Sequence, residues 1–279
     1  MRSSIVILLT VLVFTACKKQ DDNTAYKIMQ DQSYGADSKQ KMDIYLPAQR
    51  SADTTKVIFL IHGGGWTEGD KADFNSFVTA IQSLFPGYAI FNINYRLFAN
   101  NQNLFPAQEN DVKAAVEFVA AKRNEFLISD KWAFLGASAG GHLALLQSYK
   151  YSSPVKPKAV ISFFGPTDLT ALYNDWTNPV ISILLAQVTG ATPSTNSIVY
   201  QQSSPVTFVN AQSCPTLLLQ GGQDPLVPVS QATGLRDKLQ AMTVPNQYVF
   251  YPNDGHGWQG ADLLDSFDKI RSFLNQYMN

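Results

Sequence analysis

The stretch W-A-F-L-G-A-S-A-G-G-H-L-A-L-L-Q-S-Y, residues 132–149, decides the fold that we expect for this chain. Its beginning, residues 132–135, is a short apolar run of the kind that forms a buried strand. Its end, residues 141–149, has a helical pattern. Between them, residues 136–140 fit the motif G-x-S-x-G, in which small residues let the chain turn sharply from strand to helix. The stretch therefore predicts Ser138 as a nucleophile that projects from the end of a sheet.

Further short apolar runs lie on both sides of this stretch, each bounded by glycine, proline or asparagine. They are rich in β-branched and aromatic residues and occupy positions 57–61, 88–93, 159–164, 216–219 and 248–251. Continuous runs of this kind are typical of strands buried on both faces of a parallel sheet. Residues 41–46 alternate in polarity instead and end at Pro47, which predicts a half-buried edge strand.

Helical patterns alternate with these strands. Residues 111–122 place apolar side chains on one face, and residues 263–277 repeat them at spacings of three and four. The alternation predicts the α/β class: one three-layer domain, residues 34–279, with a mostly parallel central sheet and helices on both faces. Residues 168–212 hold no clear strand, and we expect them to form a modest cap-like insertion over one end of the sheet.

A glycine-rich turn, His62-Gly63-Gly64-Gly65-Trp66, follows the predicted strand 57–61. Because glycine has no side chain, the backbone N–H groups of Gly64 and Gly65 are unobstructed and could bind the oxyanion that develops during acyl transfer. The N–H of Ala139, directly after the nucleophile, would complete such an oxyanion hole. The alternative is a phosphate-binding turn. That motif, however, requires the spacing G-x-G-x-x-G and an acidic residue about twenty positions later, and both are absent here.

The general base can be sought among only three histidines. His62 belongs to the glycine turn, where its ring is expected to brace the loop. His142 lies four residues after Ser138 in the predicted helix, so that its side chain points along the helix. His256 remains, in a late loop after the strand 248–251, from which it could reach over the sheet end and accept a proton.

The acid that orients this base should lie between Ser138 and His256 at the end of a strand. Asp224 does, directly after the strand 216–219. Two other carboxylates compete with it. Asp168 follows the preceding strand but opens the insertion, and Asp254, two residues before His256, is more typical of a turn former. We therefore predict a triad of Ser138, Asp224 and His256.

The chain order serine, aspartate, histidine is that of α/β-hydrolases. With the motifs above, the sequence resembles this superfamily, specifically its esterase/lipase branch with an H-G-G-G-W loop. It is similar in pattern to bacterial feruloyl and acetylxylan esterase-like proteins and, more distantly, to hormone-sensitive-lipase-like esterases. The resemblance runs from about residue 34 to the C-terminus, and further matching segments are residues 41–47, 69–71, 94–96, 105–107 and 255–258. Arg96 and Asp111 also match, and we expect them to pair structurally.

Together, the resemblance and the triad imply a serine carboxylic-ester hydrolase that works through an acyl-enzyme. We expect a small-molecule or carbohydrate ester as substrate, such as an acetyl or feruloyl ester. A general short-chain carboxylesterase or lipase is the alternative, and a non-catalytic binding protein with the same fold is a remote one. Trp66 and Trp258 lie in loops expected at the site and are candidate substrate-binding residues, although ordinary packing would explain them equally well.

The net charge and the number of histidines limit the classes of partner and cofactor that we expect. The net charge of −1 removes the usual electrostatic basis for nucleic-acid binding. Three scattered histidines without an H-E-x-x-H motif provide no metal-ligand set, and the expected mechanism needs no metal or other cofactor.

The first 17 residues form a separate unit. Arg2 precedes an apolar stretch at residues 5–14 that is too short to span a bilayer, which is typical of a processed signal peptide. Phe14-Thr15-Ala16-Cys17 resembles the lipobox of bacterial lipoproteins, with phenylalanine where leucine is usual. We therefore expect Cys17 to be lipidated and the protein to be exported and anchored to a bacterial membrane, with the cell surface as one candidate location. Residues 18–33 are expected to form a tether and entry segment. The alternative is an ordinary secretory signal with an incidental cysteine.

If Cys17 carries lipid, Cys214 has no cysteine to pair with. Cys214 immediately precedes the predicted strand 216–219, and we expect it to be buried as a small apolar side chain.

Overall fold

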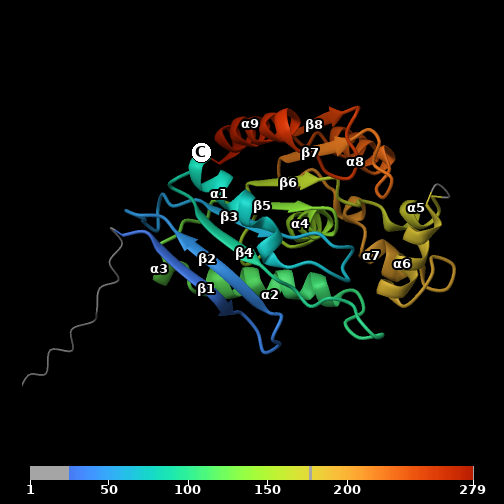
Figure 1. Ribbon diagram of the computed structural model, residues 1–279, viewed down its shortest axis with the longest axis horizontal. Coiled ribbons are helices and arrows are strands. Elements are labelled where there is room, and N and C mark those ends of the chain that lie inside the picture. The colour runs from blue at the N-terminus through green and yellow to red at the C-terminus, as the bar shows by residue number, and fades with distance from the viewer. Residues whose placement is uncertain (1–24, 176–177, 279) are drawn as a thin grey trace, which may run out of the picture.

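The computed structural model describes residues 25–175 and 178–278. In this part of the chain an eight-stranded sheet runs through the centre of the molecule, with helices above and below it (Figure 1). The strand order is β1-β2-β4-β3-β5-β6-β7-β8. The strands are β1 (Lys27–Ser33), β2 (Lys41–Leu46), β3 (Val57–Ile61), β4 (Ala89–Ile93), β5 (Trp132–Ala137), β6 (Ala159–Phe163), β7 (Thr216–Gly221) and β8 (Asn246–Tyr251).

The pairing is parallel from β4 through β8, and antiparallel only where β1 meets β2 and β2 meets β4. Strands β3 to β7 are buried along their whole length apart from Ala137, as the continuous apolar runs predict. The predicted class, a mostly parallel three-layer α/β fold, is confirmed.

The prediction that residues 41–46 form an edge strand is wrong. β2 lies between β1 and β4, and β1 takes the edge. The sequence of β1, K-I-M-Q-D-Q-S, is mostly polar and its side chains are exposed or half-buried, so it lacks the apolar run by which the other strands were recognised. Pairing through the backbone is enough to place it.

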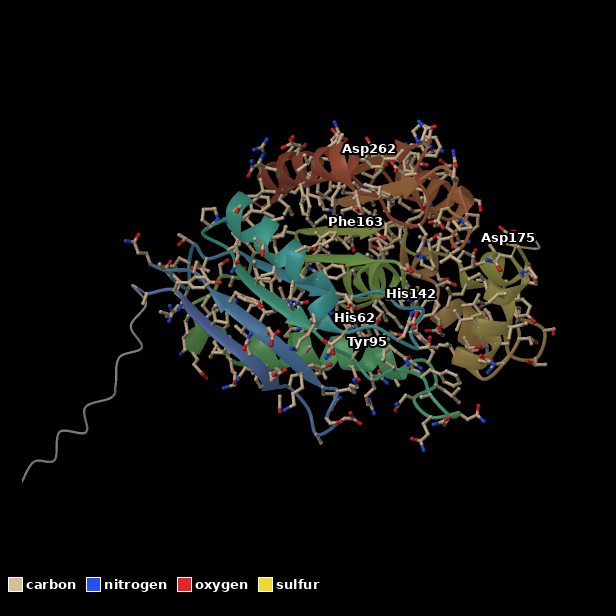
Figure 2. All side chains as sticks on the ribbon, viewed as in Figure 1. His62, Tyr95, His142, Phe163, Asp175 and Asp262 are labelled. Atoms are coloured by element: carbon tan, nitrogen blue, oxygen red, sulfur yellow. The ribbon has the colours of Figure 1, made fainter. Side chains whose placement is uncertain are left out.

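Two apolar layers enclose the sheet. On one face, α1 (Asn75–Leu84) and α9 (Gly260–Tyr277) pack over a cluster that includes Phe163 (Figure 2). On the other face lie α2 (Ala107–Ala121), α4 (Ala139–Lys150) and α8 (Val229–Ala241), and the short helix α3 (Arg123–Phe126) follows α2. Helices cover both faces of the sheet because strands this apolar are stable only when both of their sides are buried.

The cap-like insertion, residues 168–212, contains short helices at one end of the sheet (Figure 1). They are α5 (Leu169–Tyr173), α6 (Pro179–Thr189), α7 (Ser197–Gln202) and the 3-10 turn η2 (Pro205–Phe208). A further 3-10 turn, η1 (Lys71–Phe74), follows the glycine turn. Among the described residues, no helix has both the length and the apolar character needed to cross a membrane.

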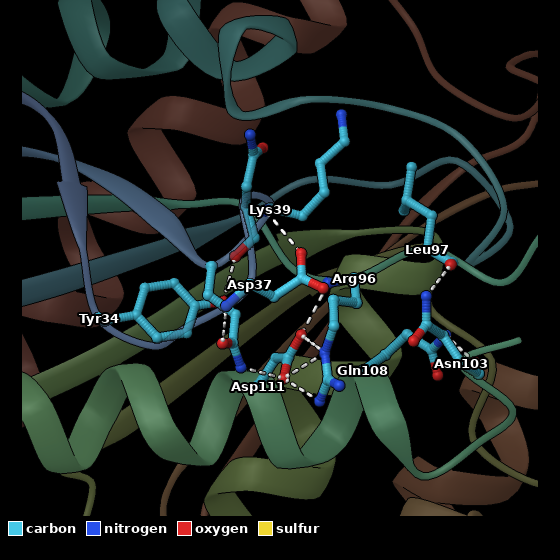
Figure 3. Close-up of polar contacts among 10 residues, drawn as sticks. Tyr34, Asp37, Lys39, Arg96, Leu97, Asn103, Gln108 and Asp111 are labelled. Carbon is cyan, nitrogen blue, oxygen red and sulfur yellow. Dashed lines mark hydrogen bonds and ion pairs between the residues drawn. The ribbon is translucent and has the colours of Figure 1, made fainter.

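An ion pair with a buried carboxylate ties the loop after β4 to helix α2. Arg96 contacts Asp111 through Nη2 at 2.7 Å and Nε at 2.9 Å, and the backbone N–H of Arg96 donates to the same carboxylate at 2.8 Å. Gln40, from the turn before β2, donates to it as well. Figure 3 shows this group beside Tyr34 and Asp37. The geometry agrees with the expected structural pairing, since the Asp111 side chain is 1% exposed and bonds to Arg96 and Gln40.

Asp111→Ala should lower the free energy of unfolding by about 3 kcal/mol, because it leaves a guanidinium without its buried carboxylate. Urea denaturation measures the change. Glu117→Ala is the matched control, since it breaks an exposed pair with Lys113 on the same helix and should cost less than about 0.5 kcal/mol. Equal losses in the two variants would contradict the structural role of the buried pair.

Candidate active site

Ser138 lies at the sharp turn between β5 and α4, with φ 54° and ψ −124°. The turn is possible because the residues two positions before and two positions after Ser138 are glycines. A Cβ on Gly140 would lie 2.0 Å from the carbonyl oxygen of Ile61, and one on Gly136 would lie 2.2 Å from the carbonyl oxygen of Gly140. The Ser138 N–H donates to the carbonyl of Phe163 at 2.8 Å, which ties the turn to β6. The backbone thus presents the hydroxyl at the carboxyl end of the sheet.

His256 and Asp224 meet this hydroxyl from two other strand ends. His256 follows β8, and its Nε2 lies 2.9 Å from Ser138 Oγ. Its Nδ1 lies 2.8 Å from Asp224 Oδ2. Because a carboxylate only accepts, Nδ1 carries the proton and Nε2 is free to accept one from the serine. The three residues form a continuous hydrogen-bonded chain.

Asp224 is itself held in place. Its side chain is fully buried, while that of His256 is 18% exposed. Oδ1 accepts from the backbone N–H groups of Leu226 and Val227, each at 2.9 Å. These two donors leave Oδ2 directed at the imidazole. The loop after β7 therefore orients the carboxylate before any substrate binds.

The competing carboxylates have other partners. Asp168 is the N-cap of α5 and accepts from the N–H of Ala171 at 2.9 Å. Asp254 faces Asp262, and burial together with a hydrogen bond from that neighbour raises the pKa of Asp254. Of the three aspartates considered, the described structure joins Asp224 to the histidine.

The glycine turn lies beside the nucleophile and adopts a left-handed backbone. Its φ angles are 100° at Gly64, 56° at Gly65 and 63° at Trp66. A Cβ on Gly64 would lie 2.1 Å from the carbonyl oxygen of Glu68, so that only glycine fits this position. No backbone hydrogen bond within the described residues uses the N–H of Gly64 or Gly65. Ala139 begins α4, where an N–H has no partner within the helix.

The turn is braced from beneath. The Tyr95 hydroxyl donates to the carbonyls of His62 at 2.9 Å and Gly63 at 3.1 Å. The His62 ring stacks on Tyr95 with centroids 4.3 Å apart, and its Nδ1 lies 2.8 Å from the Gly63 carbonyl. Both residues are labelled in Figure 2. Burial lowers the pKa of His62, so the ring is neutral near neutral pH. As expected, this histidine braces the loop.

A pocket of about 430 Å³ opens over the serine and the glycine turn. Its walls are mostly apolar and come from the cap, from the loop after β7 and from the end of β6: Leu172, Val180, Ile181, Leu184, Leu226, Val227, Phe164 and Pro166. Among the residues that line the pocket, Glu68 carries a carboxylate. The site therefore combines a nucleophile, a base, candidate oxyanion donors and room for an apolar group.

Comparison with known proteins identifies the family. The sequence profile of BD-FAE matches residues 42–239, which include the glycine turn, Ser138 and Asp224. The chain belongs to the BD-FAE family. This is an α/β-hydrolase esterase family, and the predicted resemblance is confirmed.

Relatives of this BD-FAE protein include two from Mycobacterium tuberculosis. The chain is 34% identical to "Probable carboxylic ester hydrolase LipM" over 76% of its own length and 51% of that protein, and 26% identical to "Esterase LipC" over 87% and 64%. It thus spans between about half and two thirds of the length of these curated relatives.

Solved structures share the fold. "Truncated form of carbohydrate esterase from gut microbiota" superposes with a TM-score of 0.72 at 21% identity, covering 91% of this chain and 99% of that one. "Bifunctional GH43-CE" of Bacteroides eggerthii gives a TM-score of 0.77 at 25% identity, covering 93% and 39%.

The two tryptophans predicted to bind substrate occupy different places in this BD-FAE domain. Trp66 borders the pocket but is only 3% exposed. Trp258 lies outside the residues that line it. Its indole N–H donates to Ser266, and its ring packs on Phe163 and Phe164, so the apolar layer under α9 takes up this side chain.

Phe164 is a pocket residue that the sequence analysis missed. Its ring lies 4.5 Å from that of His256, at a backbone φ of 39°. The available signal was its position as the last residue of the apolar run 159–164, beside the nucleophile strand. The apolar cap residues gave no such signal, because their pattern is also that of core residues.

The structure describes one of the two cysteines of this BD-FAE protein. Cys214 is buried as expected, and burial raises the pKa of its thiol to about 12. Cys17, the predicted lipidation site, lies outside the described residues. Within the part of the chain that the structure describes, no group of three or more histidine, cysteine, aspartate or glutamate side chains is arranged to hold a metal ion.

Proposed function

We propose that this protein is a serine carboxylic-ester hydrolase that works through an acyl-enzyme. The observation that carries the proposal is the chain of hydrogen bonds from Asp224 through His256 to Ser138, at 2.8 and 2.9 Å. Membership of an esterase family and the names of the curated relatives support it.

In the proposed reaction, His256 Nε2 removes the hydroxyl proton while Ser138 Oγ attacks the ester carbonyl carbon. The N–H groups of Gly64, Gly65 and Ala139 stabilise the oxyanion of the tetrahedral intermediate. The imidazolium then gives its proton to the departing alcohol, and an acyl-enzyme remains. Water, activated by the same histidine, attacks this acyl group and releases the acid.

For the substrate, we propose acetyl or feruloyl esters of carbohydrates. A pocket of about 430 Å³ has the size of small-molecule sites and is much larger than an acetyl group requires, which favours the feruloyl group. Its walls, formed by Leu172, Leu184 and Val227 among others, suit an aromatic ring. The carboxylate of Glu68 at the rim could accept hydrogen bonds from sugar hydroxyls. Two of the structural neighbours are named for carbohydrate esterase activity or as an "acetyl ester-xyloside bifunctional hydrolase".

A general short-chain carboxylesterase is the second candidate. The curated relatives favour it, because they are named as ester hydrolases without a sugar substrate.

We further propose that the protein is exported and held at a bacterial membrane through lipid on Cys17. Support comes from the sequence: Arg2, the short apolar stretch 5–14 and the small residues Thr15 and Ala16 before the cysteine. A lipoprotein carries several acyl chains, which bind a bilayer much more firmly than a single chain does.

Ser138→Ala should abolish ester hydrolysis and labelling by a fluorophosphonate while leaving thermal unfolding unchanged. Asp224→Asn should lower kcat by about 10³–10⁴-fold, because the histidine loses its orientation and charge support. Asp168→Asn is the control, since asparagine caps a helix as well as aspartate does. Initial rates on a chromogenic butyrate ester measure all three. Full activity in Ser138→Ala, or a larger loss in Asp168→Asn than in Asp224→Asn, would refute the triad.

Leu184→Ala should lower kcat/KM for a feruloyl pentose ester about tenfold and affect the corresponding acetate less, because it removes part of the apolar wall. Ile183→Ala, next to it on α6 but 60% exposed and outside the pocket, should change neither. A panel that varies the acyl group on one sugar and the alcohol on one acid provides the comparison. Equal rates on sugar and alkyl esters of the same acid would favour the second candidate.

Cys17→Ser should move the protein from the membrane fraction to the soluble fraction of the native host. Cys214→Ser, which changes the other cysteine, should leave it in the membrane fraction. Mass spectrometry of the mature N-terminus identifies the attached lipid, and an unmodified Cys17 would disprove anchoring.

A further inference from the structure

His142 is a wholly buried histidine that the proposed mechanism does not use. It lies on α4, four residues after the nucleophile, with 0% exposure. Its Nδ1 is 3.2 Å from Trp66 Nε1, and its Nε2 is 2.7 Å from the carbonyl oxygen of Ser203. One ring therefore connects the nucleophile helix, the glycine turn and the end of the cap. Figure 2 labels His142.

The two partners determine which nitrogen carries the proton. A carbonyl only accepts, so Nε2 must donate to Ser203. An indole N–H only donates, so Nδ1 must accept from Trp66. Both bonds form together only in the neutral Nε2–H tautomer. Burial lowers the pKa of His142 to about 4, which is consistent with a neutral ring.

Trp66 is the first residue after Gly64 and Gly65 whose side chain can anchor the glycine turn. Gly64 and Gly65 have no side chains, and all three residues have positive φ angles, which a bulky residue rarely adopts. The Trp66 carbonyl accepts from the N–H of Phe98 at 2.8 Å, and its ring meets the His142 ring edge to face at 5.2 Å. The bond to His142 fixes the indole, and the backbone bond fixes the peptide that follows the oxyanion donors.

We propose that His142 is a positioning residue that holds the oxyanion turn in its reactive shape by accepting a hydrogen bond from the indole N–H of Trp66. This inference rests on the proposed esterase function. His142 does not touch the substrate, because it lies beneath the turn and is absent from the pocket wall. Its effect reaches the chemistry through the N–H groups of Gly64 and Gly65.

Trp66→Phe tests the bond most directly, since it removes the indole N–H and keeps an aromatic ring in place. We expect kcat to fall about tenfold, less than the roughly 10²–10³-fold loss of a complete oxyanion donor, with KM within twofold. Affinity for a trifluoromethyl ketone, whose adduct carries the oxyanion, should fall by the same factor as kcat. A loss of stability alone would not produce that parallel.

Two further variants separate positioning from packing. His142→Gln keeps an acceptor and a donor and should retain more of kcat than His142→Leu, which keeps neither. Tyr149 is on the same helix as His142, and its buried hydroxyl bonds to Thr216 of β7, away from the glycine turn. Tyr149→Phe removes this hydroxyl and should lower stability without changing kcat. Unchanged kcat and inhibitor affinity in Trp66→Phe would overturn the proposal, as would equal activity in the glutamine and leucine variants.

Nuclear magnetic resonance distinguishes this failure from failure of the esterase assignment. In the Ser138→Ala protein, long-range ¹H–¹⁵N spectra should show His142 protonated at Nε2 and the Trp66 indole proton protected from exchange. Protonation at Nδ1 would refute the positioning bond whatever the enzyme hydrolyses. If the wild-type protein cleaves no ester although the Trp66–His142 bond is present, the esterase function is refuted. The bond is then a structural contact only, and the catalytic part of the inference is overturned.

Discussion

The close backbone contact between Gly140 and the end of β3 is the constraint on which the rest of the site depends. A Cβ on Gly140 would lie 2.0 Å from the carbonyl oxygen of Ile61 and 2.4 Å from that of His62. The turn that carries the nucleophile therefore rests directly on the segment that leads into the glycine turn. Because the two backbones touch, Ser138 and the oxyanion donors are placed relative to each other by main-chain geometry, and their spacing does not depend on flexible side chains.

Histidine serves three purposes around this contact, and the hydrogen-bond partners decide which one. His62 lies against a carbonyl of its own turn, and His142 lies between an indole and a carbonyl. His256 lies between a carboxylate and a hydroxyl. The first two are buried, and burial lowers the pKa of each. Only the third combines partial exposure with a partner that can lose a proton, so the same side chain braces, positions or reacts according to its surroundings.

Much of this arrangement could be predicted, because buried parallel strands are continuously apolar and the nucleophile turn has a strict pattern of small residues. The runs 57–61 and 216–219 predict β3 and most of β7. Elimination among the three histidines predicts His256 as the partner of Ser138, and the two side chains do lie within hydrogen-bond distance. The edge strand β1 could not be predicted, because its mostly polar sequence lacks the apolar run that indicates a buried strand. The pocket wall on α6 could not be predicted either, because apolar residues that line a cavity show the same sequence pattern as apolar residues that fill a core. Closeness to His256 in sequence also does not decide which face of the loop a ring packs against, and the ring of Trp258 packs on Phe163 and Phe164.

The triad comes from the ends of β5, β7 and β8, and the oxyanion turn from the end of β3, so residues from position 64 to position 256 must meet. Contacts this distant in sequence form slowly, because the chain loses entropy before they stabilise it. A folding chain will acquire helices and a partial sheet well before it acquires a reactive serine. Recovery of catalytic activity during refolding therefore reports the assembly of these distant strand ends, which spectroscopic signals of secondary structure do not detect.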